Sequence, residues 1–148
     1  VGVIGAHGYA RDLPAKLRRD ADRGERRKAK PTPDLDDDVW NHLARAYGDR
    51  AEVVAGIAAN DPALAARLAP GQPVIAAEVV HAARAEYCET VNDFLARRSR
   101  LAFLDVAAAR SAAPAVARLL GNERGWGRWR VARETKEANA FLDTFEAR

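Results

Sequence analysis

The chain has 148 residues, enough for one domain with a core of its own, and its single cysteine excludes an internal disulfide. Its 24 basic and 21 acidic side chains give a net charge of +3. This charge is too balanced to identify a nucleic-acid-binding protein, although a pI near 9.3 keeps that class open. No apolar run approaches the roughly 18 residues that a membrane-spanning helix needs.

The first residues, VGVIGAHGY, look like a strand that runs into a glycine turn. Gly2, Gly5 and Gly8 give the spacing G-x-x-G-x-x-G, whereas dinucleotide-binding turns have G-x-G-x-x-G. No second strand with a terminal acidic residue follows about twenty residues later. We therefore expect residues 1–12 to be a short non-helical connector without a nucleotide site.

A short helix is predicted over residues 13–19, followed by a charged segment. Residues 18–30 carry seven Lys or Arg side chains against three acidic ones, and Pro31, Pro33 and four aspartates follow before residue 39. Such a composition cannot bury apolar area, which predicts a solvated loop over residues 24–38. A polybasic loop can also bind anionic lipid or RNA.

Three helix starts are predicted between residues 38 and 68, each at an aspartate. The first helix would begin after Asp38 and end at Gly48, the second would begin at Asp49, and the third would begin at Asp61 and reach residue 68. Pro62 fits the first position of that third helix.

Residues 73–104, PVIAAEVVHAARAEYCETVNDFLARRSRLAFL, form the most informative segment. Apolar residues recur every four positions, which predicts one face of a helix or of two end-to-end helices. Thr90 and Asp93 fit an N-cap with an acidic residue in the first turn, so a helix should restart there. The positions of the periodic face are Ile75, Val79, Ala83, Tyr87, Val91 and Leu95. The densest cluster of large apolar residues is predicted to be Phe94, Leu95, Leu101, Phe103 and Leu104.

The rest of the chain is predicted to be helical as well. Asp105 should cap a turn or two of helix, and Pro114 should begin a second piece that ends at Gly121. After a turn at residues 125–127, a last helix is expected over residues 129–145. The residues expected to face inward on this helix are Ala138, Phe141, Leu142 and Phe145.

Residues with catalytic or metal-binding potential do not form a complete set in the sequence. Glu78-x-x-His81 matches half of a di-iron motif, but the other half and two further glutamates are missing at helical spacing. The histidines and Cys88 lack short-range zinc spacing. Ser99 and Ser111 have no glycines of a nucleophile elbow around them. We therefore assign no catalytic, cofactor-binding or metal-binding residue.

The central segment resembles the C-terminal domain of FAD-dependent glycerol-3-phosphate dehydrogenase, and so do three other strings. These are LPAKL near the start, HLARAYGDRAEVV in the middle and GRWRVARETKEANAFLDTF at the end. The most specific pieces are the AEV of residues 77–79, the spacing of Glu86, Thr90 and Asp93, and the ARRSRLAFL of residues 96–104. The family usually has Thr in place of Ser99. This chain departs from the family by an insertion around residues 24–33.

The resemblance implies an all-α fold, a single compact domain of about seven helices over residues 13–148. This domain would cap an N-terminal domain that holds FAD and substrate and is missing here; a start at Val1 and the lack of methionine also indicate a fragment. The parent enzyme would oxidise glycerol 3-phosphate to dihydroxyacetone phosphate, reduce FAD and pass electrons to membrane quinone.

The parent enzyme would be peripheral or monotopic at the mitochondrial inner membrane and compatible with a homodimer. A plant- or alga-like source is preferred, because the calcium-binding helix pair of animal versions is not seen. A bacterial cytoplasmic membrane is the alternative location.

The residues to which the resemblance draws attention are interpreted as a scaffolding or interdomain motif. Three arginines at the end of the predicted helix could clamp a phosphate, but the family binds its substrate in the N-terminal domain, so ion pairs are favoured. The residues of this motif are Glu78, Glu86, Thr90, Asp93, Arg97, Arg98 and Arg100.

The alternative function is a small basic helical module that binds nucleic acid or protein. It would use residues 18–30 and the arginines after Phe94, and its binding would depend steeply on salt. The cap interpretation instead predicts an exposed apolar docking face and no nucleic-acid partner.

Overall fold

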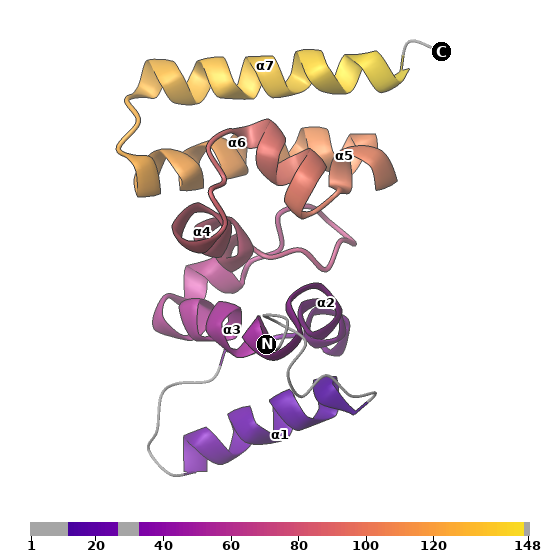
Figure 1. Cartoon of the computed structure of the whole chain (residues 1–148), viewed down its shortest axis with the longest axis vertical. Helices are drawn as coiled ribbons and strands as arrows, with labels where there is room; N and C mark the ends of the chain where they lie inside the picture. Colours follow the sequence, from indigo (N-terminus) through magenta and orange to yellow (C-terminus); the bar gives the residue numbers. More distant parts are fainter. Residues whose placement is uncertain (1–11, 27–32, 147–148) are drawn as a thin grey trace, which may run out of the picture. The chain divides into compact units, whose positions relative to one another are not determined.

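The structure, a computed structural model, describes residues 12–26 and 33–146, which form helices and turns without a strand (Figure 1). The predicted all-α class is confirmed. Seven α-helices lie in this described part, together with the short 3₁₀ helices η1 and η2 and the π-helix η3. Their bounds are α1 Leu13–Arg26, α2 Asp37–Tyr47, η1 Gly48–Arg50, α3 Ala51–Asn60, η2 Pro62–Ala65, α4 Ala76–Ala85, η3 Asp93–Arg98, α5 Leu101–Leu104, α6 Val106–Arg124 and α7 Arg128–Glu146.

The chain divides into two compact units, Val1–Ala66 and Arg67–Arg148. In the first unit α1 packs on α2, and Leu13 and Leu17 of α1 are buried, as are Trp40 and Leu43 of α2. Arg18 on α1 forms an ion pair with Asp37 at the start of α2. A single apolar stripe is therefore enough to attach α1 to its neighbour.

Two predictions about the charged segment were wrong. The first helix does not end at residue 19 but continues to Arg26, because the helix propensities of Ala21, Arg23 and Glu25 offset the poorer helix formers between them. The predicted loop over residues 24–38 is correspondingly shorter, because α2 already begins at Asp37. Within the described residues, the non-helical part of this loop is residues 33–36. Residues 27–32, like residues 1–11 of the predicted connector, lie outside the described residues.

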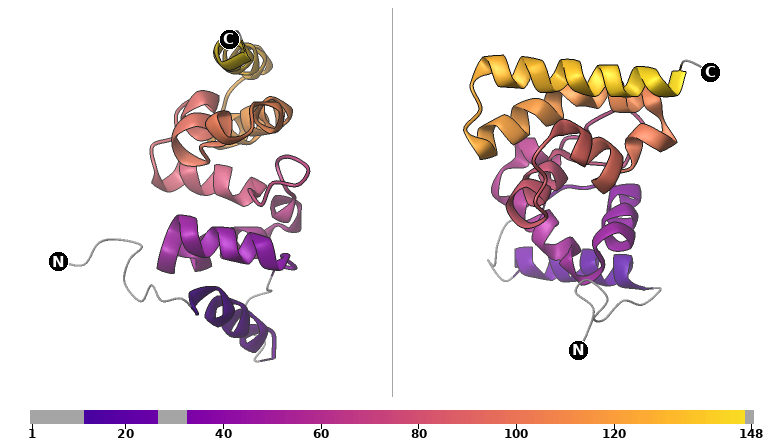
Figure 2. Two further views of the ribbon diagram at one scale, coloured as in Figure 1. Left: turned by 90° about the vertical axis from the view of Figure 1, so that its right-hand side faces the viewer. Right: turned by 45° about the horizontal axis from the view of Figure 1, so that its top comes forward.

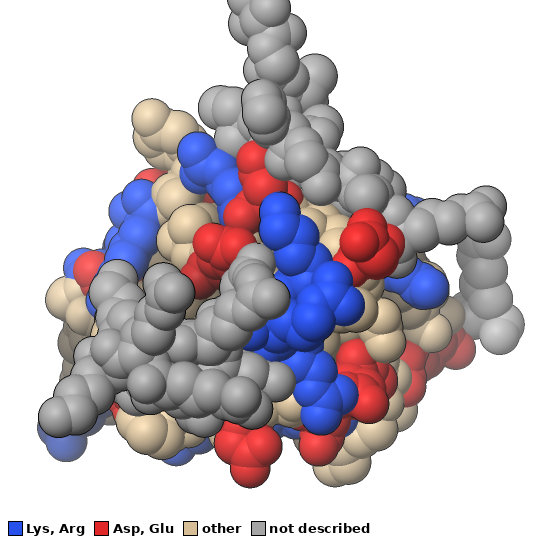
Figure 3. Space-filling view, turned by 90° about the horizontal axis from the view of Figure 1, so that it is seen from below, with Lys and Arg blue, Asp and Glu red and all other residues tan. Residues whose placement is uncertain are grey.

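Aspartates are the N-caps of α2 and η2. The predicted helix start at Asp49 was wrong, because Asp49 lies within η1 and the N-cap of α3 is Arg50. The N-cap of α2 is Asp36, so Asp38 lies in the first turn, where its charge is favourable to the helix dipole. Gly48 ends α2 with a left-handed φ of 58°. Asp61 accepts a hydrogen bond from the Ala63 N–H at 3.1 Å, but the helix that follows is a 3₁₀ turn that ends at Ala65. Figure 3 shows Lys and Arg side chains next to Asp and Glu side chains on the face seen from below.

The second unit is organised around α6 and α7, which run antiparallel and pack along each other (Figures 1 and 2). α4 packs on α6 as well. Gly121 permits the close approach of α7, because a Cβ atom there would lie 2.9 Å from Val131 Cγ2. The buried face of α6 consists mainly of small side chains: Ala108, Ala109, Ala112, Ala113, Val116, Ala117 and Leu120.

Pro114 does not begin a new helix, as the sequence predicted, but lies inside the continuous α6. The prediction rested on the lost N–H of proline, which removes one helical hydrogen bond. Pro114 is exposed, so water can bond the carbonyl that it leaves without a partner. The buried alanines on either side of it, Ala113 and Ala117, hold both halves in one helix.

Candidate functional site

The connection between α4 and η3, residues 86–90, contains two residues of the predicted motif, Glu86 and Thr90. The N–H groups of Glu86 and Cys88 both donate to the carbonyl of Ala82, at 3.0 and 3.2 Å. Between them, Tyr87 has a left-handed φ of 52°, which is rare for a bulky residue. The chain therefore turns sharply as α4 ends.

The turn at Tyr87 breaks the predicted apolar face. Ile75, Val79, Val91 and Leu95 are buried as the four-residue spacing predicted, whereas Tyr87 is 88% exposed. Periodicity assumes a continuous helix, and a left-handed residue between two helices points its side chain in another direction. The prediction that Tyr87 belongs to the buried face was wrong.

The predicted helix start at Thr90 is confirmed, because Thr90 and Asp93 cap each other. The Asp93 N–H donates to Thr90 Oγ1 at 3.0 Å, and the Thr90 N–H donates to Asp93 Oδ2 at 3.0 Å. Asp93 Oδ2 also accepts from the Glu89 N–H at 3.2 Å. This reciprocal arrangement satisfies backbone donors that the start of a helix leaves without partners.

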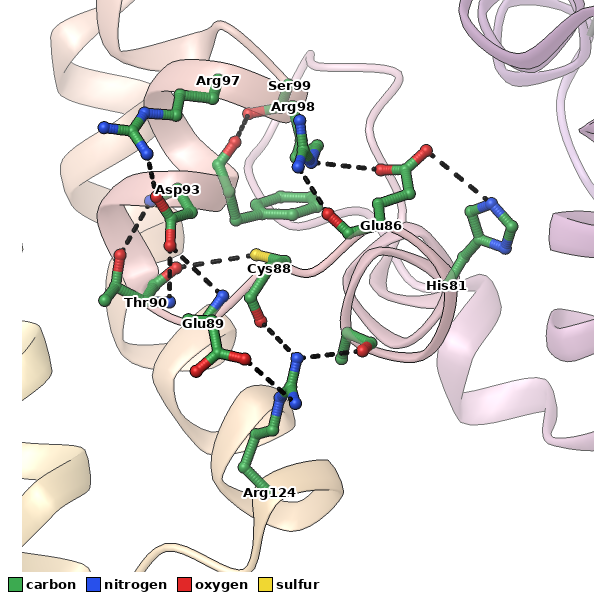
Figure 4. Close-up of polar contacts among 12 residues, drawn as sticks. His81, Glu86, Cys88, Glu89, Thr90, Asp93, Arg97, Arg98, Ser99 and Arg124 are labelled. Carbon is green, nitrogen blue, oxygen red and sulfur yellow. Dashed lines mark hydrogen bonds and ion pairs between the residues drawn. The ribbon is translucent and has the colours of Figure 1, made fainter. Parts of the chain in front are cut away.

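Two arginines hold the backbone of this connection, from opposite sides in Figure 4. Arg98 Nη2 donates to the Glu86 carbonyl, and its Nε lies 3.4 Å from Glu86 Oε2. Arg124, in the last turn of α6, donates from Nη2 to the carbonyls of Ala83 and Cys88, both at 3.1 Å. Its Nη1 lies 3.4 Å from Glu89 Oε1. We call these contacts the arginine clamp.

The remaining predicted motif residues have separate surroundings. Glu78 lies at the other end of α4, where its buried carboxylate accepts the Ile75 N–H at 2.8 Å and thereby caps the helix. Glu86 Oε1 lies 3.8 Å from Nε2 of the buried His81. Arg97 pairs with Asp93 one turn away, at 2.8 Å, and its side chain is 75% exposed. Arg100 is exposed and makes no ion pair with the described residues.

The helix that follows Thr90 is wound as a π-helix from Asp93 to Arg98. The Ser99 N–H donates to the Phe94 carbonyl five residues back, at 2.9 Å, and Ser99 Oγ donates to the same carbonyl at 3.1 Å. The wider winding places Phe94 and Leu95 in the core. Insertions of this kind are frequent at functional sites, and sequence periodicity gives no sign of them.

Two residues that contribute to this region were missed in the sequence. The buried Glu134 of α7 accepts the Val91 N–H through Oε2 at 3.2 Å, so α7 also holds the start of the restarted helix. Its position four residues before the buried Ala138 was a signal that it lies on the inner face of α7. Arg124 gave no such signal, because its acceptors lie more than thirty residues earlier in the chain.

Cys88 is buried, and its pKa is raised from 9.0 to about 12, mainly because burial disfavours the thiolate. We expect the folded chain to resist thiol alkylation near pH 8 and to react once it is unfolded by urea. The thiol of Cys88 has a higher pKa in the folded chain than in the unfolded chain. The neutral thiol therefore contributes to the free energy of unfolding in full below pH 9, and this contribution is lost between about pH 9 and 12. A Cys88→Ala variant should lack this loss. Equal alkylation rates of folded and unfolded chain would contradict the burial of the thiol.

The described residues do not fit a flavin site. The buried carboxylates Glu78 and Glu134 already accept N–H groups of this chain, and the part described contains no glycine-rich turn between a strand and a helix. No three His, Cys, Asp or Glu side chains among these residues are grouped to hold a metal ion. No helix in the described ranges is long and apolar enough to cross a membrane.

The fold and the arginine clamp define an all-helical domain in which several charged side chains bind backbone groups of the same chain. A family model described as the C-terminal domain of alpha-glycerophosphate oxidase matches residues 1–131. A mitochondrial glycerol-3-phosphate dehydrogenase of Arabidopsis thaliana is 44% identical over 113 residues, which are 76% of this chain and 18% of that protein. The mitochondrial enzyme of Mus musculus is 40% identical over 112 residues, 73% of this chain and 15% of that protein. No solved structure matches.

The chain therefore belongs to the family of C-terminal domains found in alpha-glycerophosphate oxidase and in mitochondrial glycerol-3-phosphate dehydrogenases. The resemblance inferred from the sequence is confirmed. The chain spans less than a fifth of the length of these two relatives.

Proposed function

We propose that this chain is the C-terminal helical domain of a quinone-linked, FAD-dependent glycerol-3-phosphate dehydrogenase. The observation that carries the proposal is the family match over residues 1–131, combined with relatives of which the chain covers 15–18%. FAD and glycerol 3-phosphate would bind in the N-terminal domain of the same polypeptide, to which residues 1–12 would connect the helical domain of residues 13–148. We call this longer polypeptide the parent enzyme.

The role of this domain in the proposal is scaffolding. Support comes from the hydrogen bonds of charged side chains in the described part of the chain. Arg98 and Arg124 donate to backbone carbonyls, and Asp93 accepts backbone N–H groups. Groups that are engaged in this way stabilise a fold and are not available to a substrate phosphate. The motif from Glu78 to Arg100 would thus keep the domain in shape and carry interdomain contacts.

The proposal places the parent enzyme at the mitochondrial inner membrane, peripheral or monotopic, where quinone would accept its electrons. The mitochondrial location given in the names of the relatives supports this placement. A homodimer of the parent enzyme, and the bacterial cytoplasmic membrane as the alternative location, are compatible with the proposal.

The experiment that tests the proposal compares the 148-residue chain with the parent enzyme. We expect calorimetric titration of the chain with FAD or glycerol 3-phosphate to show no binding. The parent enzyme should contain FAD and reduce a soluble quinone analogue when glycerol 3-phosphate is added. Micromolar affinity of the chain for either ligand, or a parent enzyme without this activity, would contradict the proposal.

A further inference from the structure

The short helix α5 divides its apolar residues between the core and the surface. Leu101 and Ala102 are buried, whereas Phe103 is 55% and Leu104 is 74% exposed. The four residues Leu-Ala-Phe-Leu contain no polar side chain that could shield the exposed half. Two large apolar residues therefore face outward together.

The exposed half of α5 is continuous with aromatic residues at the end of α7. The rings of Phe103 and Phe145 meet edge to face with centroids 5.4 Å apart, and Phe141 meets Phe145 in the same manner at 5.1 Å. Phe145 is itself exposed. Figure 1 shows α5 beneath the C-terminal half of α7. We call Phe103, Leu104, Phe141 and Phe145 the aromatic patch.

Local structure holds α5 in the orientation that exposes this patch. Ser99 Oγ donates to the Phe94 and Leu95 carbonyls at 3.1 and 3.4 Å and accepts the Leu101 N–H at 3.3 Å. Arg100 at the N-cap has a left-handed φ of 57°, an uncommon and costly conformation for arginine. A chain that tolerates this strain and presents two apolar residues to water has the features of a contact surface.

The charges around the patch indicate what kind of surface would cover it. Arg110 is already paired with Asp143 and Glu146, at 2.8 and 2.9 Å. Arg100, directly before α5, is exposed and has no carboxylate partner in the described part of the chain. A complementary surface would therefore be apolar opposite the patch and would offer a carboxylate to Arg100.

We propose that the aromatic patch and Arg100 dock this domain onto the N-terminal domain of the parent enzyme. This inference rests on the proposed function, because the relatives continue for more than four-fifths of their length outside the matched region, and the proposed function places the N-terminal domain there. Interdomain faces within one chain commonly combine an apolar centre with charged residues at the edge. A second copy of this chain is the competing occupant.

The test is cysteine labelling at Leu104, followed by mass spectrometry of the peptides. Leu104→Cys introduces an accessible thiol, and the native Cys88 gives little background because it is buried. Labelling of Leu104→Cys should be at least about tenfold slower in the parent enzyme than in the 148-residue chain. Adding Arg100→Glu should restore part of the labelling rate in the parent enzyme. Val53→Cys, at an exposed apolar side chain in the first unit, checks reagent activity on the 148-residue chain.

The outcomes separate the two proposals. Equal labelling rates at residue 104 in a parent enzyme that oxidises glycerol 3-phosphate would overturn the docking inference alone. A labelling rate that falls as the concentration of the 148-residue chain rises would overturn it in favour of self-association. Loss of glycerol 3-phosphate oxidation in the unsubstituted parent enzyme would instead contradict the proposed function.

Discussion

Replacing Phe94 with alanine is expected to lower the free energy of unfolding of this chain by about 3–5 kcal/mol. Phe94 is the largest fully buried side chain among the described residues, and it lies within the π-helix. Its carbonyl also accepts from the N–H and Oγ of Ser99, so the backbone around the cavity is held in place. Because the surroundings cannot collapse freely, the loss should lie toward the upper end of that range.

Phe103→Ala is the matched control, since it removes the same side chain from an exposed site nine residues later. We expect it to lower the free energy of unfolding of the 148-residue chain by no more than about 1.5 kcal/mol, because Phe103 is 55% exposed and loses mainly its ring contact with Phe145. Urea unfolding followed by circular dichroism measures both, and the midpoints should separate while the slopes stay equal. Similar losses for the two variants would mean that Phe103 is part of the core.

The contrast between these phenylalanines marks a limit of sequence reasoning. Phe94, Leu95, Leu101, Phe103 and Leu104 were predicted as one apolar cluster, and the first three are buried. The prediction for Phe103 and Leu104 was wrong. Nothing in a four-residue apolar helix shows which half faces outward, because periodicity needs several turns to define a face.

Helix caps could be predicted from the sequence, because the residues that form them are close neighbours in the chain. The caps at Thr90 and Asp105 follow from residues three positions apart, and both are present: Asp105 Oδ1 accepts the Ala108 N–H at 2.9 Å. Pro114 was misjudged, because burial of the alanines around it outweighs one lost hydrogen bond. The clamp contributed by Arg124 depends on the meeting of α4 and α6, which no local pattern encodes.

Arg124→Ala should lower the free energy of unfolding by about 1–3 kcal/mol, because one carbonyl in α4 and one in the connection after it lose a charged donor. Arg124 donates to Ala83 and Cys88, and its partly buried side chain also reaches Glu89. Arg124→Lys should recover only part of this stability, since a lysine cannot reproduce the planar geometry of the guanidinium. The left-handed turn at Tyr87 should become more mobile in both variants.

Arg97→Ala is the matched control, because it removes an arginine that does not bind the backbone of the connection. Arg97 is more exposed than Arg124 and makes a single ion pair with Asp93 within one turn, a contact worth no more than about 0.5 kcal/mol. Native-state hydrogen exchange should show faster exchange of the Glu86 and Cys88 amides in Arg124→Ala and unchanged exchange in Arg97→Ala. If both substitutions cost the same stability and left those amides protected, the turn would be held by its own backbone bonds to Ala82, and Arg124 would have no part in shaping the connection.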